Sequence, residues 1–149
     1  LLPLLLRLKK QKQELDENFM IKVYFDGVCG HCSKEIAYYK TIAPDSVFQW
    51  IDVAADPNAM NDYKITQATA LLYLHAIDEE GSIYVGSDAF ALIWKNLPKW
   101  HLLGQIISLP IIRALTQVIY TIFAKYRFKN NKHCQFASTE LHNHNKTIN

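Results

Sequence analysis

Apolar residues in the first third of the chain change from one spacing to another and back. Residues 20–25 are mostly apolar, β-branched or aromatic and precede an Asp-Gly turn, which predicts a buried strand. From residue 30 to 43, apolar side chains recur every three or four positions, which predicts a helix that ends before Pro44. Strand character resumes over 46–51. These three elements have the length of a βαβ unit.

The next part of the chain adds a helix, a hairpin and a further helix. An Asp-Pro pair opens a short helix expected over 56–64. A continuous apolar run over 69–77 predicts a third strand, and an acidic turn leads to a fourth at 82–85. The pattern over 88–97 is helical. This order predicts an α/β protein with a central mixed four-stranded sheet flanked by helices, and the thioredoxin fold is the leading candidate.

The second half also holds an additional C-terminal helical segment, over 99–128, which Pro110 divides. Part of it is apolar enough to raise the possibility of a membrane span. Arg113 interrupts that part, and an arginine in the middle of a span costs about 2.5 to 3.5 kcal/mol on insertion scales. We therefore expect the segment to pack onto the domain, and we do not favour membrane contact through 100–128.

The domain is expected to occupy residues 19–128. Met20 opens the first predicted strand, and residues 1–18 are interpreted as an N-terminal extension outside the fold, either an over-extended start or the end of a preceding segment. Residues 129–149 are rich in Asn, Lys and His and are expected to be a flexible polar tail.

Composition narrows the possible functions. A chain of 149 residues suits one domain, and a net charge of +2 with dispersed basic residues excludes a nucleic-acid partner. Three cysteines are too few for a disulfide framework, so we expect a reducing compartment, the cytoplasm. The pattern requires no cofactor and no resident metal.

The chemistry centres on Cys29 and Cys32, which fall where the first predicted strand meets the first predicted helix. Backbone N–H groups at a helix N-terminus stabilise an anion, which favours the thiolate of Cys29. We therefore expect Cys29 to be an exposed nucleophile and Cys32 the residue that resolves the mixed disulfide. The expected partners are a protein or small-molecule disulfide or dithiol and a separate reductant or oxidant that recycles the pair.

Four neighbouring residues are candidates for a supporting role. His31 lies between the cysteines, where an imidazole stabilises a thiolate or carries protons near neutral pH. Asp26 either orients the dithiol and accepts its proton or only forms a turn with Gly27, and Gly30 completes the spacer.

Two other interpretations of the cysteine pair remain open. A C-x-x-C pair also occurs in zinc sites, where Cys134 with His133, His142 and His144 would supply the missing ligands. We favour a redox dithiol because these four residues lie in the predicted tail, where we expect the histidines to be solvated. The other alternative is a non-catalytic module that docks a partner or a membrane through 100–128. The role of Cys134 is left open.

The stretch 24–32 resembles the opening motif of the DCC family of thiol-disulfide oxidoreductases, a thioredoxin-like group with an Asp-x-x-Cys-x-x-Cys signature. Asp26, Cys29 and Cys32 match that signature one for one. Residues 78–90 are similar to a second stretch of the family.

Residues 120–127 resemble the C-terminal helix of the same family, so that the resemblance covers about residues 20–128. The resemblance implies a protein-disulfide oxidoreductase. The Gly-His spacer is that of protein disulfide isomerases and implies a dithiol less reducing than that of thioredoxin.

Overall fold

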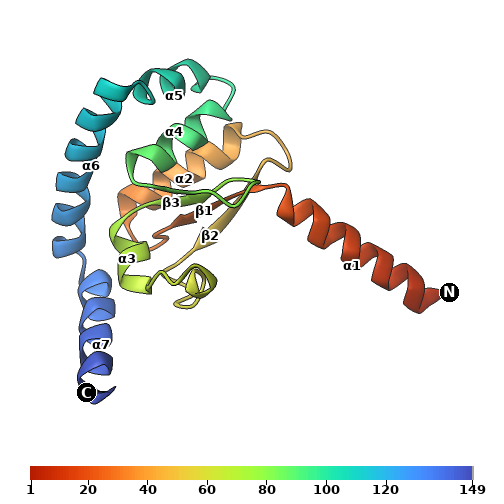
Figure 1. The fold of residues 1–149 in the computed structure, drawn as a ribbon, viewed down its shortest axis with the longest axis horizontal. Coiled ribbons are helices and arrows are strands. Elements are labelled where there is room, and N and C mark those ends of the chain that lie inside the picture. Colours follow the sequence, from red (N-terminus) through yellow and green to blue (C-terminus); the bar gives the residue numbers. More distant parts are fainter. Residues whose placement is uncertain (149) are drawn as a thin grey trace.

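A mixed four-stranded sheet lies at the centre of the chain in the computed structural model, which describes residues 1–148 apart from the side chains at positions 18, 141, 144, 145, 147 and 148 (Figure 1). The strands follow the spatial order β2-β1-β3-β4. β1 and β2 are parallel, whereas β3 is antiparallel to β1 and β4 is antiparallel to β3. Their bounds are β1 Ile21–Phe25, β2 Phe48–Asp52, β3 His75–Ile77 and β4 Ile83–Val85. The predicted α/β architecture is confirmed.

Helices cover the two faces of the sheet (Figure 1). β1 alternates between the faces, as a strand does. Its Val23 packs with Ile36 and Ile93 in a core beneath α2 and α4, whereas its Tyr24 packs with Leu71 and Cys134 in a second core on the other face. The helices are α1 Leu2–Asn18, α2 Gly30–Ile42, the short 3-10 helix η1 Asn61–Tyr63, α3 Gln67–Leu72, α4 Ser87–Lys95, α5 His101–Ile107, α6 Pro110–Asn130 and α7 Lys132–Ile148.

The predicted strand over 69–77 is wrong for most of its length. Its first residues belong to α3, and only His75–Ile77 pair in the sheet. The Thr66 hydroxyl accepts a hydrogen bond from the Thr69 N–H at 3.3 Å, which is a helix N-cap. A continuous apolar run has the same sequence pattern in a buried helix as in a buried strand. Here the N-cap at Thr66 favours the helix.

The helix expected over 56–64 is also wrong. The Asp56 carboxylate accepts a hydrogen bond from the Asn58 N–H at 3.0 Å, which closes a turn instead of starting a helix. Only Asn61–Tyr63 form a turn of 3-10 helix, and the left-handed backbone of Lys64 (φ 57°) ends it.

The expectation of a flexible polar tail at 129–149 is contradicted by α7. The side chains of Cys134 and Ala137, three positions apart, are buried in the core that contains Tyr24 and Leu71. A helix with a narrow apolar stripe docks by that stripe, although its composition is polar. The fold therefore extends beyond residue 128 and includes the part of α7 that carries Cys134 and Ala137.

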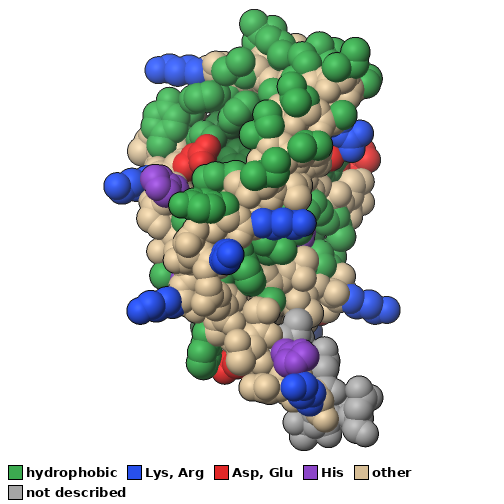
Figure 2. Space-filling model, turned by 90° about the vertical axis from the view of Figure 1, so that its left-hand side faces the viewer, with side chains coloured by type: hydrophobic (Ala, Val, Ile, Leu, Met, Phe, Trp, Pro, Cys, Tyr) green, Lys and Arg blue, Asp and Glu red, His purple; other side chains and the backbone are tan. Residues whose placement is uncertain are grey.

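The two remaining helical segments leave apolar side chains exposed. α1 projects from the sheet in Figure 1, and its leucines are exposed. α5 and α6 carry a second exposed apolar surface, and the hydrophobic side chains gathered on that side of the molecule are visible in Figure 2. Among residues 1–148, no single helix is long and apolar enough to cross a membrane, and the α5 and α6 pair that passes this test together bends by 92° at its break.

Candidate active site at the dithiol

Cys29 and Cys32 lie at the N-terminus of α2, directly after the turn that follows β1. Cys29 is the N-cap, with φ −66° and ψ 120°, and its Sγ accepts a hydrogen bond from the Cys32 N–H at 3.5 Å. Both residues are free thiols. The predicted position of the pair, between first strand and first helix, is confirmed.

The accessibility of the two sulfurs is the reverse of the expected one. Cys29 is only 2% exposed, whereas Cys32 is half-buried and lines a cavity of about 60 Å³. The turn before α2 is pulled inward, because one oxygen of Asp26 accepts hydrogen bonds from the N–H groups of Val28 (3.1 Å) and Cys29 (3.2 Å). The expectation that Cys29 is exposed is therefore wrong.

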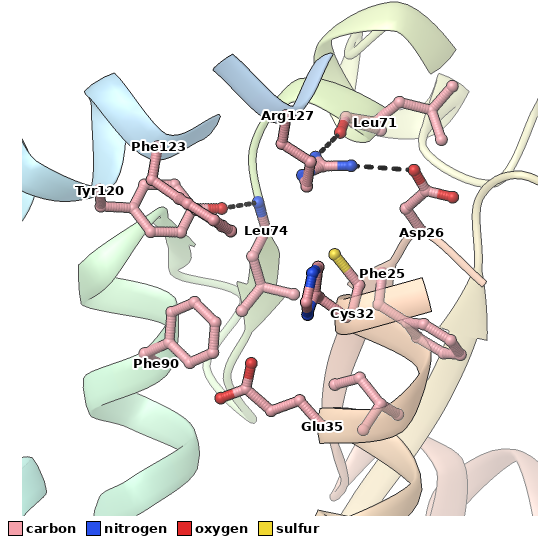
Figure 3. A pocket seen from close by; sticks show the side chains of 13 residues that line it. Phe25, Asp26, Cys32, Glu35, Leu71, Leu74, Phe90, Tyr120, Phe123 and Arg127 are labelled. Carbon is pink, nitrogen blue, oxygen red and sulfur yellow. Dashed lines mark hydrogen bonds and ion pairs between the residues drawn. The ribbon is translucent and has the colours of Figure 1, made fainter. Parts of the chain in front are cut away.

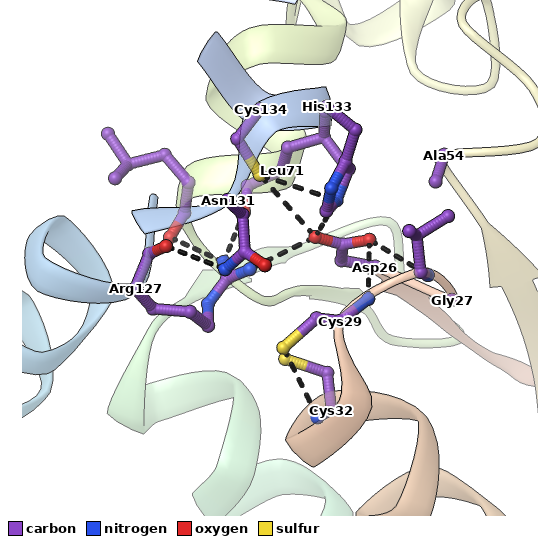
Figure 4. A network of polar contacts seen from close by, with 12 residues as sticks. Asp26, Gly27, Cys29, Cys32, Ala54, Leu71, Arg127, Asn131, His133 and Cys134 are labelled. Carbon is purple, nitrogen blue, oxygen red and sulfur yellow. Dashed lines mark hydrogen bonds and ion pairs between the residues drawn. The ribbon is translucent and has the colours of Figure 1, made fainter. Parts of the chain in front are cut away.

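The other oxygen of Asp26 receives side chains from the C-terminal helices (Figure 4). Arg127 Nη1 donates to it at 3.0 Å, and His133 Nε2 lies 2.7 Å away. Cys134 Sγ lies 3.6 Å from the same oxygen. We call Asp26, Arg127, His133 and Cys134 the Asp26 network. It is built on the residue directly after β1 and closed by residues of α6 and α7.

Arg127 also fixes the position of α6 over the dithiol. Its Nη2 donates to the carbonyl oxygen of Leu71 and, at 3.3 Å, to that of Leu72, at the end of α3. In Figure 3 the guanidinium lies between the Leu71 carbonyl group, Asp26 and the sulfur of Cys32. These three acceptors, on Asp26, Leu71 and Leu72, offset the cost of burying the charged guanidinium.

Burial sets the protonation of the groups around the dithiol. Burial and the hydrogen bond with Cys29 raise the pKa of Cys32 to about 12, and burial together with the negative charge of Asp26 raises the pKa of Cys134 to about 12. For Asp26, burial acts to raise the pKa, but the hydrogen bonds from His133 and from the N–H groups of Val28 and Cys29 hold the pKa below its ordinary value. At neutral pH Asp26 is thus a carboxylate between two protonated thiols.

The cavity beside Cys32 is walled mainly by apolar and aromatic side chains (Figure 3). Tyr120 of α6 is held in place because its hydroxyl accepts a hydrogen bond from the Leu74 N–H at 2.7 Å. A second hollow, of about 300 Å³, lies between α4 and α6. The two share four lining residues: Glu35, Phe90, Tyr120 and Phe123. Together they form one apolar groove that leads to Cys32.

The remaining predicted site residues, Gly27, Gly30 and His31, differ in how closely other atoms surround them. A Cβ at Gly27 would lie 2.0 Å from a carboxylate oxygen of Asp52, so any other residue here requires that carboxylate to move. At Gly30 a Cβ would meet none of the described atoms within 4 Å. His31 is exposed and lines the cavity beside Cys32.

Of the ligands named for the alternative zinc site, those that the structure describes do not come together around the cysteine pair. Asp26, His133 and Cys134 offer ligand atoms within 4.8 Å of one another, and this group includes neither Cys29 nor Cys32. Arg127 donates to the same carboxylate oxygen, so a metal ion there would lie against a guanidinium cation. The residues present fit a hydrogen-bonded ion network and do not fit a metal site.

The histidines expected to be solvated behave differently from one another. His133 is held by Asp26, whereas His142 is exposed, and the side chain of His144 lies outside the described residues. His75 is buried with Nδ1 2.7 Å from the Tyr73 carbonyl oxygen, and Nδ1 of His101 lies 2.6 Å from the Lys95 carbonyl oxygen. Both of these contacts are with backbone carbonyl groups of the fold.

Sequence reasoning did not connect the other three members of the Asp26 network with Asp26: Arg127 was not named as a site residue, and His133 and Cys134 were considered only as ligands of the alternative zinc site. Arg127, His133 and Cys134 lie about a hundred residues from Asp26 in the sequence, so no local spacing connects them. An available signal was the arginine itself, which follows a run of apolar helical positions in the segment that resembles the family's last helix.

Comparison with known proteins agrees with this geometry. The profile of the DCC1-like thiol-disulfide oxidoreductase family matches residues 23–133. An uncharacterized chloroplastic protein of Arabidopsis thaliana is 24% identical over 132 residues, and this stretch covers 85% of the present chain but only 60% of the relative. No solved structure matches the chain.

Proposed function

The chain belongs to the DCC1-like thiol-disulfide oxidoreductase family, and from that premise we propose that Cys29 and Cys32 exchange a dithiol for a disulfide with a substrate. In this reaction a thiolate attacks a disulfide sulfur, a mixed disulfide forms, and a second thiolate displaces it. The enzyme alternates between a dithiol and an intramolecular disulfide. The direction of exchange is set by the reduction potentials of the enzyme and its partners.

The observation that carries the proposal is the contact between the two cysteines at a helix N-terminus beside an open cavity. The Cys29 sulfur already accepts the Cys32 N–H at 3.5 Å, which brings the two residues into the same helical turn. A thiolate at Cys29 is stabilised there by the partial positive charge of the helix end. Two inert core cysteines would require neither the contact between them nor the position at a helix N-terminus.

The Asp26 network supports this chemistry by holding the dithiol turn. Asp26 fixes the N–H groups before α2, and Arg127 places a positive charge near the sulfurs, where it stabilises a thiolate. Asp26 is also a carboxylate beside the dithiol turn that can take up a thiol proton, and His133, whose side chain is 25% exposed, connects it to solvent.

The proposed partners are those expected from the sequence: a protein or small-molecule disulfide or dithiol, and a reductant or oxidant that recycles the pair. The Arabidopsis relative is, by its name, a chloroplastic protein. The cytoplasmic location expected for this chain stays a prediction.

The proposal is tested by the reduction of insulin by dithiothreitol with the protein as catalyst. We expect Cys29→Ser and Cys32→Ser each to lower the rate to that of dithiothreitol alone, because a two-electron exchange needs both sulfurs. Cys134→Ser should retain catalysis, since it leaves the pair intact and its hydroxyl can donate to Asp26. Catalysis that survives in both variants of the pair would contradict the proposed function.

A further inference from the structure

The outward face of α6 carries a row of apolar side chains that no other part of the described chain covers. Its members follow one another at three or four positions, which places them on one side of the helix. All are exposed: Ile111, Leu115, Val118, Ile122 and Tyr126. We call these five residues the α6 stripe. An exposed apolar row of this kind marks a site that contacts another molecule or a membrane.

α5 extends this surface around the bend between the two helices. The axes of α5 and α6 differ by 92°, and Leu109 at the corner is 52% exposed. The exposed apolar side chains of α5 are Leu102, Leu103 and Ile106. In Figure 2 hydrophobic side chains gather over the upper part of this side of the molecule, and Lys and Arg lie at its margins and below it. Apolar surface therefore occupies both arms of the corner.

The charges at the two ends of this surface have one sign. Between positions 89 and 139 the sequence contains no Asp or Glu, and over 100–124 the single Lys or Arg is Arg113. Exposed lysines lie on both sides of that stretch: Lys95 and Lys99 before it, and Lys125, Lys129 and Lys132 after it. An apolar helix face between clusters of lysine is typical of a helix that lies on a membrane surface.

Arg113 is turned away from the α6 stripe. Its Nε and Nη2 donate to the two carboxylate oxygens of Asp88, at 2.8 Å each, so its charge is held against α4. The sequence did not favour membrane contact because an arginine inside a span is costly. A helix on the membrane surface leaves this guanidinium in water. Glu35, the other acidic residue near α6, lines the hollow between α4 and α6 and is not part of the stripe.

We propose that the α6 stripe and the apolar corner with α5 bind the surface of a membrane that contains anionic lipid. The stripe is aliphatic except for Tyr126, whereas a protein interface makes one hydrogen bond per about 100 to 200 Å². A second copy of the chain would bring the same lysines together, which costs free energy, whereas anionic headgroups attract them. Binding of this kind is independent of the proposed exchange reaction.

The arrangement of the side chains fits the layers of a membrane surface. Aliphatic groups of the stripe enter the boundary between headgroups and acyl chains, and the lysine stems extend along it with their ammonium groups at the phosphates. Tyr126 lies at the end of the stripe next to Lys125 and three positions before Lys129. Tyrosine is favourable at this level of a membrane, because its ring is apolar and its hydroxyl is polar.

The proposal is tested by co-sedimentation of the full chain with vesicles of phosphatidylcholine alone or of phosphatidylcholine and phosphatidylserine in equal parts. We expect binding to the mixed vesicles and at least about tenfold weaker binding to phosphatidylcholine alone, because several lysines act together. High salt should release the protein from the mixed vesicles, since salt screens the attraction. No binding to the mixed vesicles, or equal binding to both kinds, would overturn the proposal.

Ile122→Asp tests the stripe itself. Ile122 is 66% exposed and lines neither the cavity beside Cys32 nor the hollow between α4 and α6, so the variant should unfold at the wild-type urea midpoint. We expect its affinity for the mixed vesicles to fall by about tenfold or more, because one aliphatic contact is lost and a negative charge faces the headgroups. Ser138→Asp adds the same charge on the exposed side of α7 and should bind as the wild-type protein does.

α1 is the other helix with exposed leucines, and Leu4→Asp distinguishes it from α6. Leu4 is 57% exposed, so this change matches Ile122→Asp in exposure and charge. We expect a smaller loss of binding, because the last turns of α1 carry acidic residues that anionic headgroups repel: Glu14, Asp16 and Glu17. A loss in Leu4→Asp that equals or exceeds the loss in Ile122→Asp would overturn the proposal.

The alternative occupant of the stripe, a second copy of the chain, is tested without vesicles. We expect the wild-type protein and Ile122→Asp to elute at the same volume in size-exclusion chromatography. A wild-type dimer that Ile122→Asp converts to a monomer would overturn the proposal and assign the stripe to self-association.

Discussion

Five hydrogen-bond contacts from three parts of the chain converge on the carboxylate of Asp26. It joins the turn before α2 to two helices from the other end of the chain, through Arg127 and His133. Its side chain is 2% exposed and that of Arg127 is 8% exposed, so the two charges compensate each other inside the protein. Removal of one partner of such a pair leaves the other as an unpaired buried charge.

We therefore expect Asp26→Asn to lower the free energy of unfolding at pH 7 by about 3 to 5 kcal/mol. Because the pKa of Asp26 is lowered in the folded state, its carboxylate stabilises the fold above the unfolded-state pKa of about 4, and this stabilisation is lost as the pH falls through the folded-state pKa. Urea unfolding at pH 7, 5, 4 and 3 should show a steeper loss of stability in the wild-type protein than in the variant. Parallel curves would mean that Asp26 does not carry this dependence.

The two glycines of the dithiol turn provide a matched pair of substitutions. Gly27→Ala forces the Asp52 carboxylate away from the N–H groups of Gly27 and Ala54, which it binds at 2.9 Å each. We expect a loss of about 1 to 3 kcal/mol of unfolding free energy from these unmade bonds. Gly30→Ala enters open space at the first turn of α2 and should change stability by less than about 1 kcal/mol. Equal unfolding midpoints for the two variants would contradict this account.

At the scale of elements, α7 packs against the core although its composition is polar. It buries Cys134 and Ala137 against the core of Tyr24 and Leu71 and brings His133 to Asp26. It therefore covers the dithiol site on the side of Asp26.

A carboxylate introduced on the buried or on the exposed side of α7 tests whether the helix packs against the core or only forms a helix. Ala137→Asp places a carboxylate in the buried core and should lower the unfolding free energy by about 2 to 4 kcal/mol. Ser138→Asp places the same side chain one position further along, on the exposed side, and should stay within about 0.5 kcal/mol of the wild-type protein. The lower helix propensity of Asp than of Ala adds at most about 0.7 kcal/mol to the loss expected for Ala137→Asp. Guanidinium unfolding of the two variants measures the difference, and a similar loss in both would show that α7 does not pack by this face.

The elements that could be predicted from the sequence are those with a local signal. β1 ends at an Asp-Gly turn, α2 has a helical period and stops before Pro44, and the acidic turn defines the hairpin of β3 and β4. The run 69–77 has no period that separates helix from strand, and the deciding cap at Thr66 lies outside it.

The site residues that could be predicted are likewise those with a local sequence signal. Asp26, Cys29 and Cys32 lie within seven consecutive positions, 26–32, so their spacing identifies them. Arg127 reaches Asp26 across 101 positions and His133 across 107, a contact that depends on how α6 and α7 pack and not on any nearby residue. The exposure of Cys29 was predicted wrongly for the same reason, because the network that covers it comes from these distant helices.

At the scale of the whole molecule, the sheet with α2, α3, α4, α6 and α7 surrounds the dithiol, whereas α1 extends away from it (Figure 1). The side chains of residues 1–16 are exposed. We therefore predict that removal of residues 1–18 changes the unfolding free energy by less than about 0.5 kcal/mol, as for other surface changes. Thermal and urea unfolding of the shortened chain check this, and a loss of several kcal/mol would show that α1 belongs to the fold.

The account depends most directly on the reversible pairing of Cys29 with Cys32, which a redox titration measures. The protein is equilibrated in buffers of increasing oxidised glutathione, acid-quenched and alkylated, and each cysteine is quantified by mass spectrometry. We predict that Cys29 and Cys32 lose their thiols together along a two-electron curve, and that buried Cys134 stays reduced throughout. Thiols that persist at both positions up to fully oxidising buffer, or a disulfide that includes Cys134, would contradict the account.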